Sequence, residues 1–173
     1  MNAIKTMITM LPLMALGECM QTYGSTYCDA GEVNEINASG IVNVNKTNVL
    51  GMTDIKGSLN AKNATFKSLF VYGNAYLKDV KIYDETKVYG FLEAMNSDIQ
   101  NMEISADKMI LDHTSIHQIL VKPSQSGLRL IVLRNGATVS GNVCFEGGRG
   151  QVRLESGSSI NGQVINGDVI EIN

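Results

Sequence analysis

The chain has no tryptophan, only two prolines and few charged residues. Charged side chains make up 18% of its 173 residues, against about 25% in an average domain. Fourteen basic residues against seventeen acidic ones leave a net charge of −3, which gives no positive surplus for binding nucleic acid or an anionic membrane surface. The small net charge and the 44% apolar content also argue against a disordered chain. We therefore expect one folded domain without a nucleic-acid partner.

A long apolar span is also missing, because the main apolar run covers only residues 7–16. That is about half of the roughly 20 residues that a membrane-spanning helix needs. Lys5 precedes the run, and Ala15 and Gly17 place small residues at the −3 and −1 positions of a cut after Gly17. This layout predicts a secretory signal peptide over residues 1–17, with a buried N-terminal helix as the alternative. We expect a periplasmic or secreted bacterial protein that meets a membrane only through this signal.

Cysteine is rare, and the three cysteines show no Cys-x-x-Cys or Cys/His spacing typical of zinc sites. Cys19 and Cys28 lie nine residues apart and are predicted to form a disulfide in an oxidising compartment, which leaves Cys144 unpaired. Cys19 also raises the alternative of a lipoprotein anchor. Glu18 argues against that anchor, because lipobox sequences carry a small residue at this position.

The dominant feature is an internal repeat of about seventeen residues. A frame of the form apolar–x–small–x–variable recurs along the chain at intervals of 16 to 18 residues, with a last interval of 21. Its copies start at Ala38, Ile55, Val71, Val88, Ile104, Val121, Val139 and Ile160. Such a period indicates stacked structural units.

Apolar residues alternate within each copy, as on a strand with one buried face. A second apolar column follows eleven residues after each start, and a third, fainter column lies near Met52, Leu69 and Met102. The small third residue of the frame, such as Gly90, is expected where the interior is narrow. The sixteen asparagines suit turns with left-handed conformation and hydrogen-bonded ladders between turns.

Three short strands per repeat predict an all-β fold, a single-stranded parallel β-helix (β-solenoid) of about eight coils over residues 38–173. Residues 18–37 form a cysteine-containing lead-in or an N-terminal cap. The C-terminal segment 168–173 alternates in apolar residues without a polar cap. Exposed strand edges at that end favour association with another copy.

The frames Val139-Ser-Gly-Asn-Val143 and Ile160-Asn-Gly-Gln-Val164, the short coil and the Asn/Gly-rich C-terminus resemble bactofilins, a family of polymer-forming bacterial β-helix proteins. The resemblance covers about residues 38–173. It implies a right-handed, triangular β-helix whose ends stack into filaments. The chain departs from the family in its apparent signal peptide and its cysteine-bearing N-terminal segment, because bactofilins are cytoplasmic.

The carboxylates do not predict a catalytic site. Two-carboxylate glycoside hydrolysis needs acids about 5–10 Å apart across a cleft. The acids here are scattered, and the adjacent pair Asp84-Glu85 points to opposite sides of a strand. Short coils also leave no room for long cleft-building loops. We therefore expect no enzymatic activity and no cofactor, with a carbohydrate-active enzyme or an acyltransferase as the alternative.

Two further motifs are interpreted as structural. His113 and His117 would share a face of one strand, but two histidines are too few ligands for a metal site, so we expect solvated histidines. The stretch Glu146-Gly-Gly-Arg-Gly150 lacks the Gly-Lys-Ser/Thr ending of a phosphate loop. It fits a turn that lengthens the last coil.

Aromatic residues supply the candidate binding site. If Val71, Gly73 and Ala75 face inward, alternation places four aromatic side chains on one outer face. They are Tyr72, Tyr76, Tyr89 and Phe91, and the offset of seventeen residues stacks Tyr72 against Tyr89. Either residues 18–37 or a neighbouring subunit cover these rings, or the rings bind a protein or a glycan. The same alternation turns Cys144 outward.

The expected function follows from these features. We expect an exported, non-enzymatic structural or interaction protein that binds a protein or an envelope glycan through an outer face. Its ends are expected to self-associate into a homo-oligomer or polymer. A surface adhesin is an alternative with the same fold.

Overall fold

The computed structural model describes residues 19–124, 127 and 129–172. These residues form sixteen strands and no helix. The strands are β1 (Cys19–Thr22), β2 (Ser25–Val33), β3 (Ile36–Lys62), β4 (Thr65–Lys78), β5 (Lys81–Tyr89), β6 (Leu92–Met95), β7 (Asp98–Ser105), β8 (Lys108–Asp112), β9 (Ser115–Val121), β10 (Leu130–Arg134), β11 (Thr138–Val139), β12 (Val143–Phe145), β13 (Gly150–Glu155), β14 (Ser159–Ile160), β15 (Val164–Ile165) and β16 (Gly167–Ile172).

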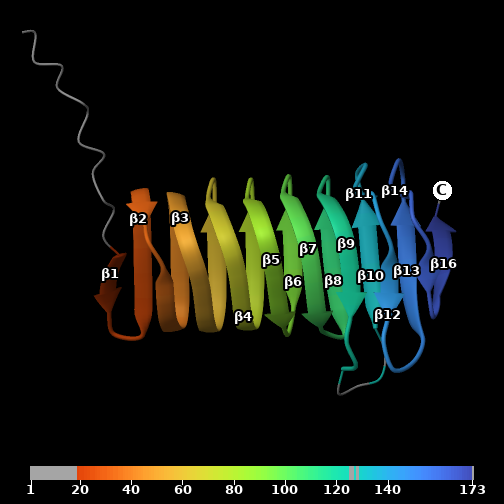
Figure 1. Cartoon of the computed structure of the whole chain (residues 1–173), viewed down its shortest axis with the longest axis horizontal. Coiled ribbons are helices and arrows are strands. Elements are labelled where there is room, and N and C mark those ends of the chain that lie inside the picture. Colours follow the sequence, from red (N-terminus) through yellow and green to blue (C-terminus); the bar gives the residue numbers. More distant parts are fainter. Residues whose placement is uncertain (1–18, 125–126, 128, 173) are drawn as a thin grey trace, which may run out of the picture.

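The predicted parallel β-solenoid is confirmed. Strands of each turn pair in parallel with the equivalent strands of the next turn, at intervals of about 17 residues. The turns lie side by side along the long axis, from β1 at one end to β16 at the other (Figure 1). There are about nine turns instead of the expected eight. The parallel pairing already begins at Ser25, where β2 lies against β3, so the first turn falls inside the segment 18–37.

The first column of the repeat is stacked as expected over five turns. Its members, in register from turn to turn, are Ile55, Val71, Val88, Ile104 and Val121. Each of these side chains is almost fully buried. Because one turn covers the next, burial of this column extends the core along most of the rod.

The prediction that Val139 and Ile160 continue this column is wrong. Phe145 stacks on Val121, whereas Val139 stacks on Ile116 of the second column and Ile160 stacks on Val139. The reason is an insertion, because the chain leaves the coil after Val121 and returns at β10 (Leu130–Arg134). Equal spacing in sequence therefore no longer means an equal position in the coil.

Met52 was expected in the third column, and this prediction is also wrong. The pairing of β3 with β4 shifts its register between Val49 and Met52. After this bulge Thr53 points inward and stacks on Leu69, while Met52 is 49% exposed. A one-residue slip exchanges the two faces of a strand.

The glycines of the frame have a different role from the expected one. Gly57, Gly73 and Gly90 are only partly buried and have φ angles near +144°. A Cβ atom on Gly90 would lie 2.2 Å from the carbonyl oxygen of Gly73. Glycine is therefore required by the close approach of backbones in neighbouring turns at one corner, and not by a narrow interior.

A second corner carries residues with positive φ in successive turns. They are Lys46, Asn63, Asp79, Asn96, His113 and Asn135. Asn96 Nδ2 donates a hydrogen bond to Asp79 Oδ1 at 3.3 Å, one turn away. The expectation that asparagine serves left-handed turns is confirmed, and this bond is one link between neighbouring turns at the corner. Residues 146–149 likewise form a turn between β12 and β13.

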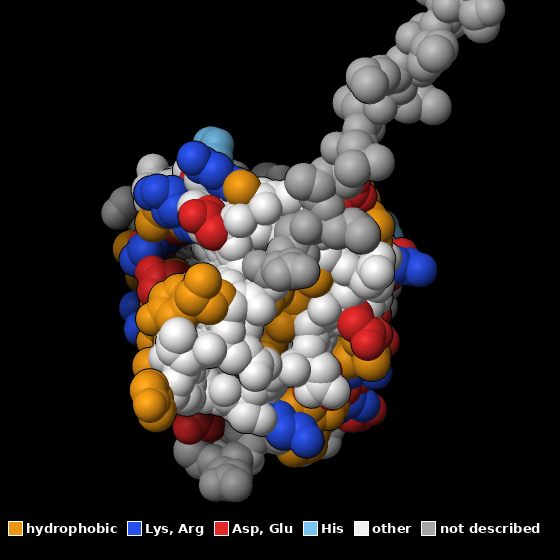
Figure 2. All heavy atoms as spheres, turned by 90° about the vertical axis from the view of Figure 1, so that its left-hand side faces the viewer, with side chains coloured by type: hydrophobic (Ala, Val, Ile, Leu, Met, Phe, Trp, Pro, Cys, Tyr) orange, Lys and Arg blue, Asp and Glu red, His pale blue; other side chains and the backbone are white. Residues whose placement is uncertain are grey.

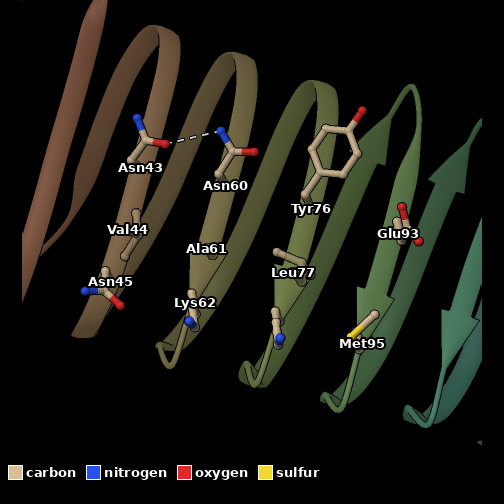
Figure 3. Close-up of a pocket in the computed structure, with 11 residues that line it drawn as sticks. Asn43, Val44, Asn45, Asn60, Ala61, Lys62, Tyr76, Leu77, Glu93 and Met95 are labelled. Carbon is tan, nitrogen blue, oxygen red and sulfur yellow. Dashed lines mark hydrogen bonds between the residues drawn. The ribbon is translucent and has the colours of Figure 1, made fainter.

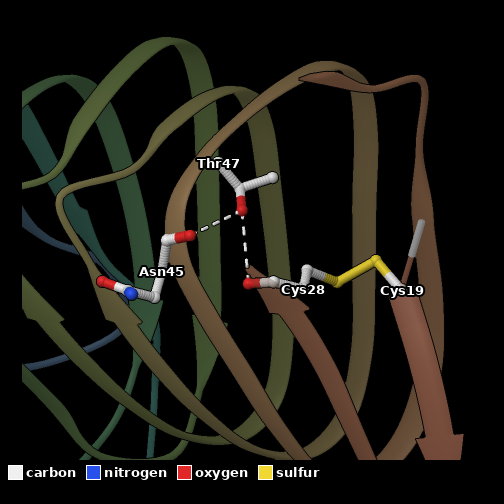
Figure 4. Close-up of a disulfide and its surroundings, with 4 residues drawn as sticks. All are labelled: Cys19, Cys28, Asn45 and Thr47. Atoms are coloured by element: carbon white, nitrogen blue, oxygen red, sulfur yellow. Dashed lines mark hydrogen bonds between the residues drawn. A yellow bond between two sulfur atoms is a disulfide. The ribbon is translucent and has the colours of Figure 1, made fainter. Parts of the chain in front are cut away.

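The N-terminal end carries a short antiparallel addition to the solenoid. β1 pairs antiparallel with β2, and Cys19 forms a disulfide with Cys28 across this pair. Thr47 Oγ1 of the next turn donates to the carbonyl oxygen of Cys28 at 3.2 Å (Figure 4). Apolar side chains remain visible in the middle of this end face (Figure 2). β1 thus covers only part of the first turn.

Candidate functional site: an aromatic corner

Gly57, Gly73 and Gly90 stack at one corner of the solenoid, which we call the glycine corner. Four aromatic side chains gather where the chain bends at this corner. Tyr72 and Tyr76 lie on β4, Tyr89 ends β5, and Phe91 precedes β6. The chain bends at Gly90 between β5 and β6. We call Tyr72, Tyr76, Tyr89 and Phe91 the aromatic corner.

The rings are arranged as two pairs. Tyr72 and Tyr89 are stacked, with ring centroids 5.0 Å apart and an interplanar angle of 5°, so the stacking expected from their offset is confirmed. Tyr76 and Phe91 pack at 5.7 Å with a tilt of 51°. The two ring pairs lie on either side of the bend. Tyr72 is in backbone register with Tyr89 of β5, before the bend, and Tyr76 is in register with Glu93 of β6, after it. The expectation of a single flat face is therefore wrong, because the glycine corner separates the two pairs.

The rings are open to solvent in this chain. Tyr72 is 49% exposed, Tyr76 41% and Tyr89 39%, while Phe91 is half-buried. Residues 19–37 form β1, β2 and the start of β3 at the N-terminal end, so they do not cover the rings. The described part of the lead-in is therefore not the cover, and exposed rings of this kind are typical of contact surfaces.

Burial and a neighbouring carboxylate act on one tyrosine of the aromatic corner, Tyr89. Tyr89 OH donates to Glu103 Oε1 at 3.3 Å. Burial and the nearby Glu103 carboxylate raise the pKa of Tyr89. Lys87 Nζ lies 2.9 Å from Glu85 Oε1, and this hydrogen bond raises the pKa of Lys87. The Tyr89 phenol therefore stays protonated at any physiological pH and presents an uncharged ring.

A groove of about 600 Å³ adjoins the corner on the Tyr76 side. Figure 3 shows two rows of side chains that cross neighbouring turns of its floor. The first row holds Asn43, Asn60, Tyr76 and Glu93, and the second holds Asn45, Lys62, Lys78 and Met95. Asn60 Nδ2 donates to Asn43 Oδ1 at 3.2 Å. The groove thus offers amide, ammonium and aromatic groups together.

A second depression, of about 560 Å³, lies at the bend itself, between this turn and the next. Tyr89, Gly90 and Phe91 form one wall, and Ser105 and Lys108 contribute to the other. The aromatic corner therefore stands between two concave surfaces. Concave sites with aromatic walls and a few polar groups are typical of ligand binding.

The histidines are exposed, as expected, but they do not share one strand. His113 has a φ of +46° and lies in the turn between β8 and β9, whereas His117 lies on β9. His113 Nδ1 is 3.0 Å from the carbonyl oxygen of Asn135, and His117 Nδ1 is 3.0 Å from Ser140 Oγ. No group of three or more His, Cys, Asp or Glu side chains in the described residues is arranged to hold a metal ion.

A charged cluster on the outside of β6, β8 and β10 was missed from the sequence. Arg134 Nε bonds Asp112 Oδ2 at 2.7 Å, and Arg134 Nη2 lies 3.3 Å from Glu93 Oε1. Asn135 Nδ2 also donates to Asp112 Oδ1 at 2.8 Å. The insertion before β10 places Arg134 twenty-two residues after Asp112, outside the regular period. Because Arg134 bonds the carboxylates of both Glu93 and Asp112, the cluster stabilises the stacking of neighbouring turns.

Cys144 is half-buried and unpaired among the described residues. Its neighbours Val143 and Phe145 are fully buried, which confirms that alternation turns Cys144 outward. Its outer-face neighbours in the adjoining turns are Leu120 and Ile165. This position leaves the thiol on an apolar strip away from the aromatic corner.

The fold and this surface define a parallel β-solenoid with an aromatic corner between two depressions. Comparisons with protein-family models, with curated proteins and with solved structures find no match for this chain. The described residues contain no helix of the length and apolar character needed to cross a membrane.

Proposed function

We propose that the protein is an exported, non-enzymatic binding module of bactofilin-like architecture, and that its aromatic corner binds an envelope glycan. The carrying observation is the aromatic corner, where three tyrosine rings stay 39–49% exposed beside concave surfaces. Flat aromatic rings contribute a large contact area at a low cost in conformational entropy. Sugar rings present flat C–H faces and rims of hydroxyl groups, which suit aromatic rings flanked by amide and charged groups.

The rigid frame supports this proposal. Tyr72 and Tyr89 project from paired parallel strands whose inner neighbours, Val71 and Val88, are fully buried. Binding groups held on such strands lose little freedom when a ligand binds. A bound glycan would therefore meet a surface that is already in place.

Glycan-array and pull-down binding of the purified protein, repeated with the double variant Tyr72→Ala/Tyr89→Ala, tests the proposal. Tyr83→Ala is the matched control, because Tyr83 lies on β5, is 53% exposed and is outside the corner. We expect the double variant to lose glycan binding about fivefold or more, since the loss of two exposed rings removes about 1–3 kcal/mol of contact. Equal glycan binding by the wild type and the double variant would show that the aromatic corner is not the binding site. Capture of a protein and of no glycan would favour the protein-binding alternative.

The ends of the solenoid give the second part of the proposal, which is self-association. β16 pairs on one edge with β13, and no described strand covers its other edge. Val169 continues the inner column of Val152 but is 45% exposed. We propose that a second copy covers this end.

Cell fractionation separates a periplasmic protein from the surface adhesin that the same fold would allow.

A further inference from the structure

The groove beside Tyr76 contains two lysines with no acidic partner. Lys62 of β3 and Lys78 of β4 are in register on neighbouring turns, and both are exposed. Neighbouring strands lie about 4.8 Å apart, so the two ammonium groups project side by side. Like charges directly opposite each other on a sheet are destabilising.

Three other lysines on the solenoid have the acidic partner that is missing here. Lys81, Lys87 and Lys122 each form an ion pair with a carboxylate, at 3.7, 2.9 and 2.8 Å. The next residue in register after Lys78 is Met95, and Asp112, which follows Met95 in the row, is bonded by Arg134. The nearest acid in the neighbouring row, Glu93, is bonded by Arg134. The positive charge in the groove is therefore not neutralised by the described residues.

We propose that this groove binds a carboxylated glycan, one that contains uronic acids. The carboxylate of one sugar lies between Lys62 Nζ and Lys78 Nζ, which supply charge-assisted hydrogen bonds. The ring of the next sugar packs on Tyr76, in the first row of the groove. The amide groups of Asn43 and Asn60, which already bond each other, face the sugar hydroxyls from the same row.

Charge favours a glycan of low charge density over a phosphate polymer. The chain has a net charge of −3, so a dense polyanion is repelled by the molecule as a whole. Only two neighbouring lysines are free in the groove, which matches one carboxylate between uncharged sugars. This inference rests on the proposed function and adds the class of glycan.

Titration of the purified protein with hyaluronan oligomers, in which glucuronate alternates with an uncharged amino sugar, tests the inference. The same oligomers with their carboxyl groups reduced to alcohols are the uncharged probe. We expect the acidic oligomer to bind at least about tenfold more tightly than the reduced one, because charge-assisted bonds are the stronger ones. We also expect this difference to shrink as salt is raised.

Two variants separate charge recognition from ring stacking. Lys62→Gln/Lys78→Gln should bind both oligomers equally, while Tyr76→Ala should weaken both. Lys67→Gln is the matched control, since Lys67 is an exposed lysine of β4 outside the groove and without an ion pair. Since all three lysines are exposed, these changes leave the core intact.

Three results would overturn the inference. They are equal binding of the two oligomers by the wild type, an unchanged preference in Lys62→Gln/Lys78→Gln, and preferential binding of a polyol-phosphate polymer. If the reduced oligomer binds and this binding is lost in Tyr72→Ala/Tyr89→Ala, the proposed function stands and only the acidic class is wrong. If no glycan binds at all, the proposed function fails as well.

Discussion

Two threonines in the core leave their hydroxyl groups without a hydrogen-bond partner. Thr53 and Thr86 are fully buried, and neither Oγ1 atom meets an acceptor or donor of the described residues. Thr86 stands in an inner column between Leu69 and Met102. A buried hydroxyl without a partner costs about 1–3 kcal/mol.

We predict that Thr86→Val stabilises the protein by about 1 kcal/mol, because valine keeps the branched shape without the buried hydroxyl. Thr114→Val is the matched control. Thr114 is also buried, but its Oγ1 donates to the carbonyl oxygen of Asp112 at 2.9 Å, so this change should destabilise. Urea unfolding of both variants measures the difference. Destabilisation by Thr86→Val would show that its hydroxyl has a partner, such as a buried water.

The glycine corner sets the spacing of neighbouring turns at the scale of a structural element. Gly90→Ala is predicted to destabilise by at least about 2 kcal/mol, because it adds a backbone clash to an unfavourable φ. Gly148→Ala is the control, since Gly148 has the same φ of +146° but a Cβ atom there meets only the flexible end of the Arg129 side chain, at 3.1 Å. Thermal unfolding of both should show the larger loss at Gly90. Equal losses would mean that φ alone matters.

The repeat was predictable wherever the coil is uninterrupted. The column from Ile55 to Val121 could be read from regular spacing because each strand alternates around a buried face. Val139 and Ile160 were misplaced because an insertion changes which residues of successive turns are in register. The alternation of apolar residues within each strand stays the same and does not reveal the insertion. Thr53 was missed because a bulge exchanges the inner and outer faces of the strand, and because a polar residue such as threonine is not expected in the core.

The candidate site was predictable only in part. Alternation and the repeat offset were enough to stack Tyr72 on Tyr89. The bend at Gly90, which separates the two aromatic pairs, depends on a backbone contact between turns. The lysine pair was missed because Lys62 and Lys78 become neighbours only once the register between β3 and β4 is known.

At the scale of the whole molecule, charge governs how the ends meet. Residues 19–40 include Asp29, Glu32 and Glu35 but no basic residue, and residues 156–172 include Asp168 and Glu171 but no basic residue. Any contact between two ends therefore joins acidic surfaces. Their repulsion is weakened by salt.

We predict that light scattering finds larger species as protein concentration and salt rise. Val169→Asp should reduce this association, because it adds a charge to the exposed inner column at β16. Leu50→Asp is the control, since Leu50 is 46% exposed on β3, far from β16 along the solenoid. A mass that stays monomeric under all these conditions would contradict self-association through this end.

The aromatic corner is the surface on which we propose that a glycan binds. A crystal structure of the protein with a bound oligosaccharide tests this proposal most directly. We predict sugar rings packed on the tyrosines of the corner, with the chain of sugars extending into the groove beside Tyr76. A sugar bound on another face, with Tyr72 and Tyr89 still open to solvent, would contradict the account.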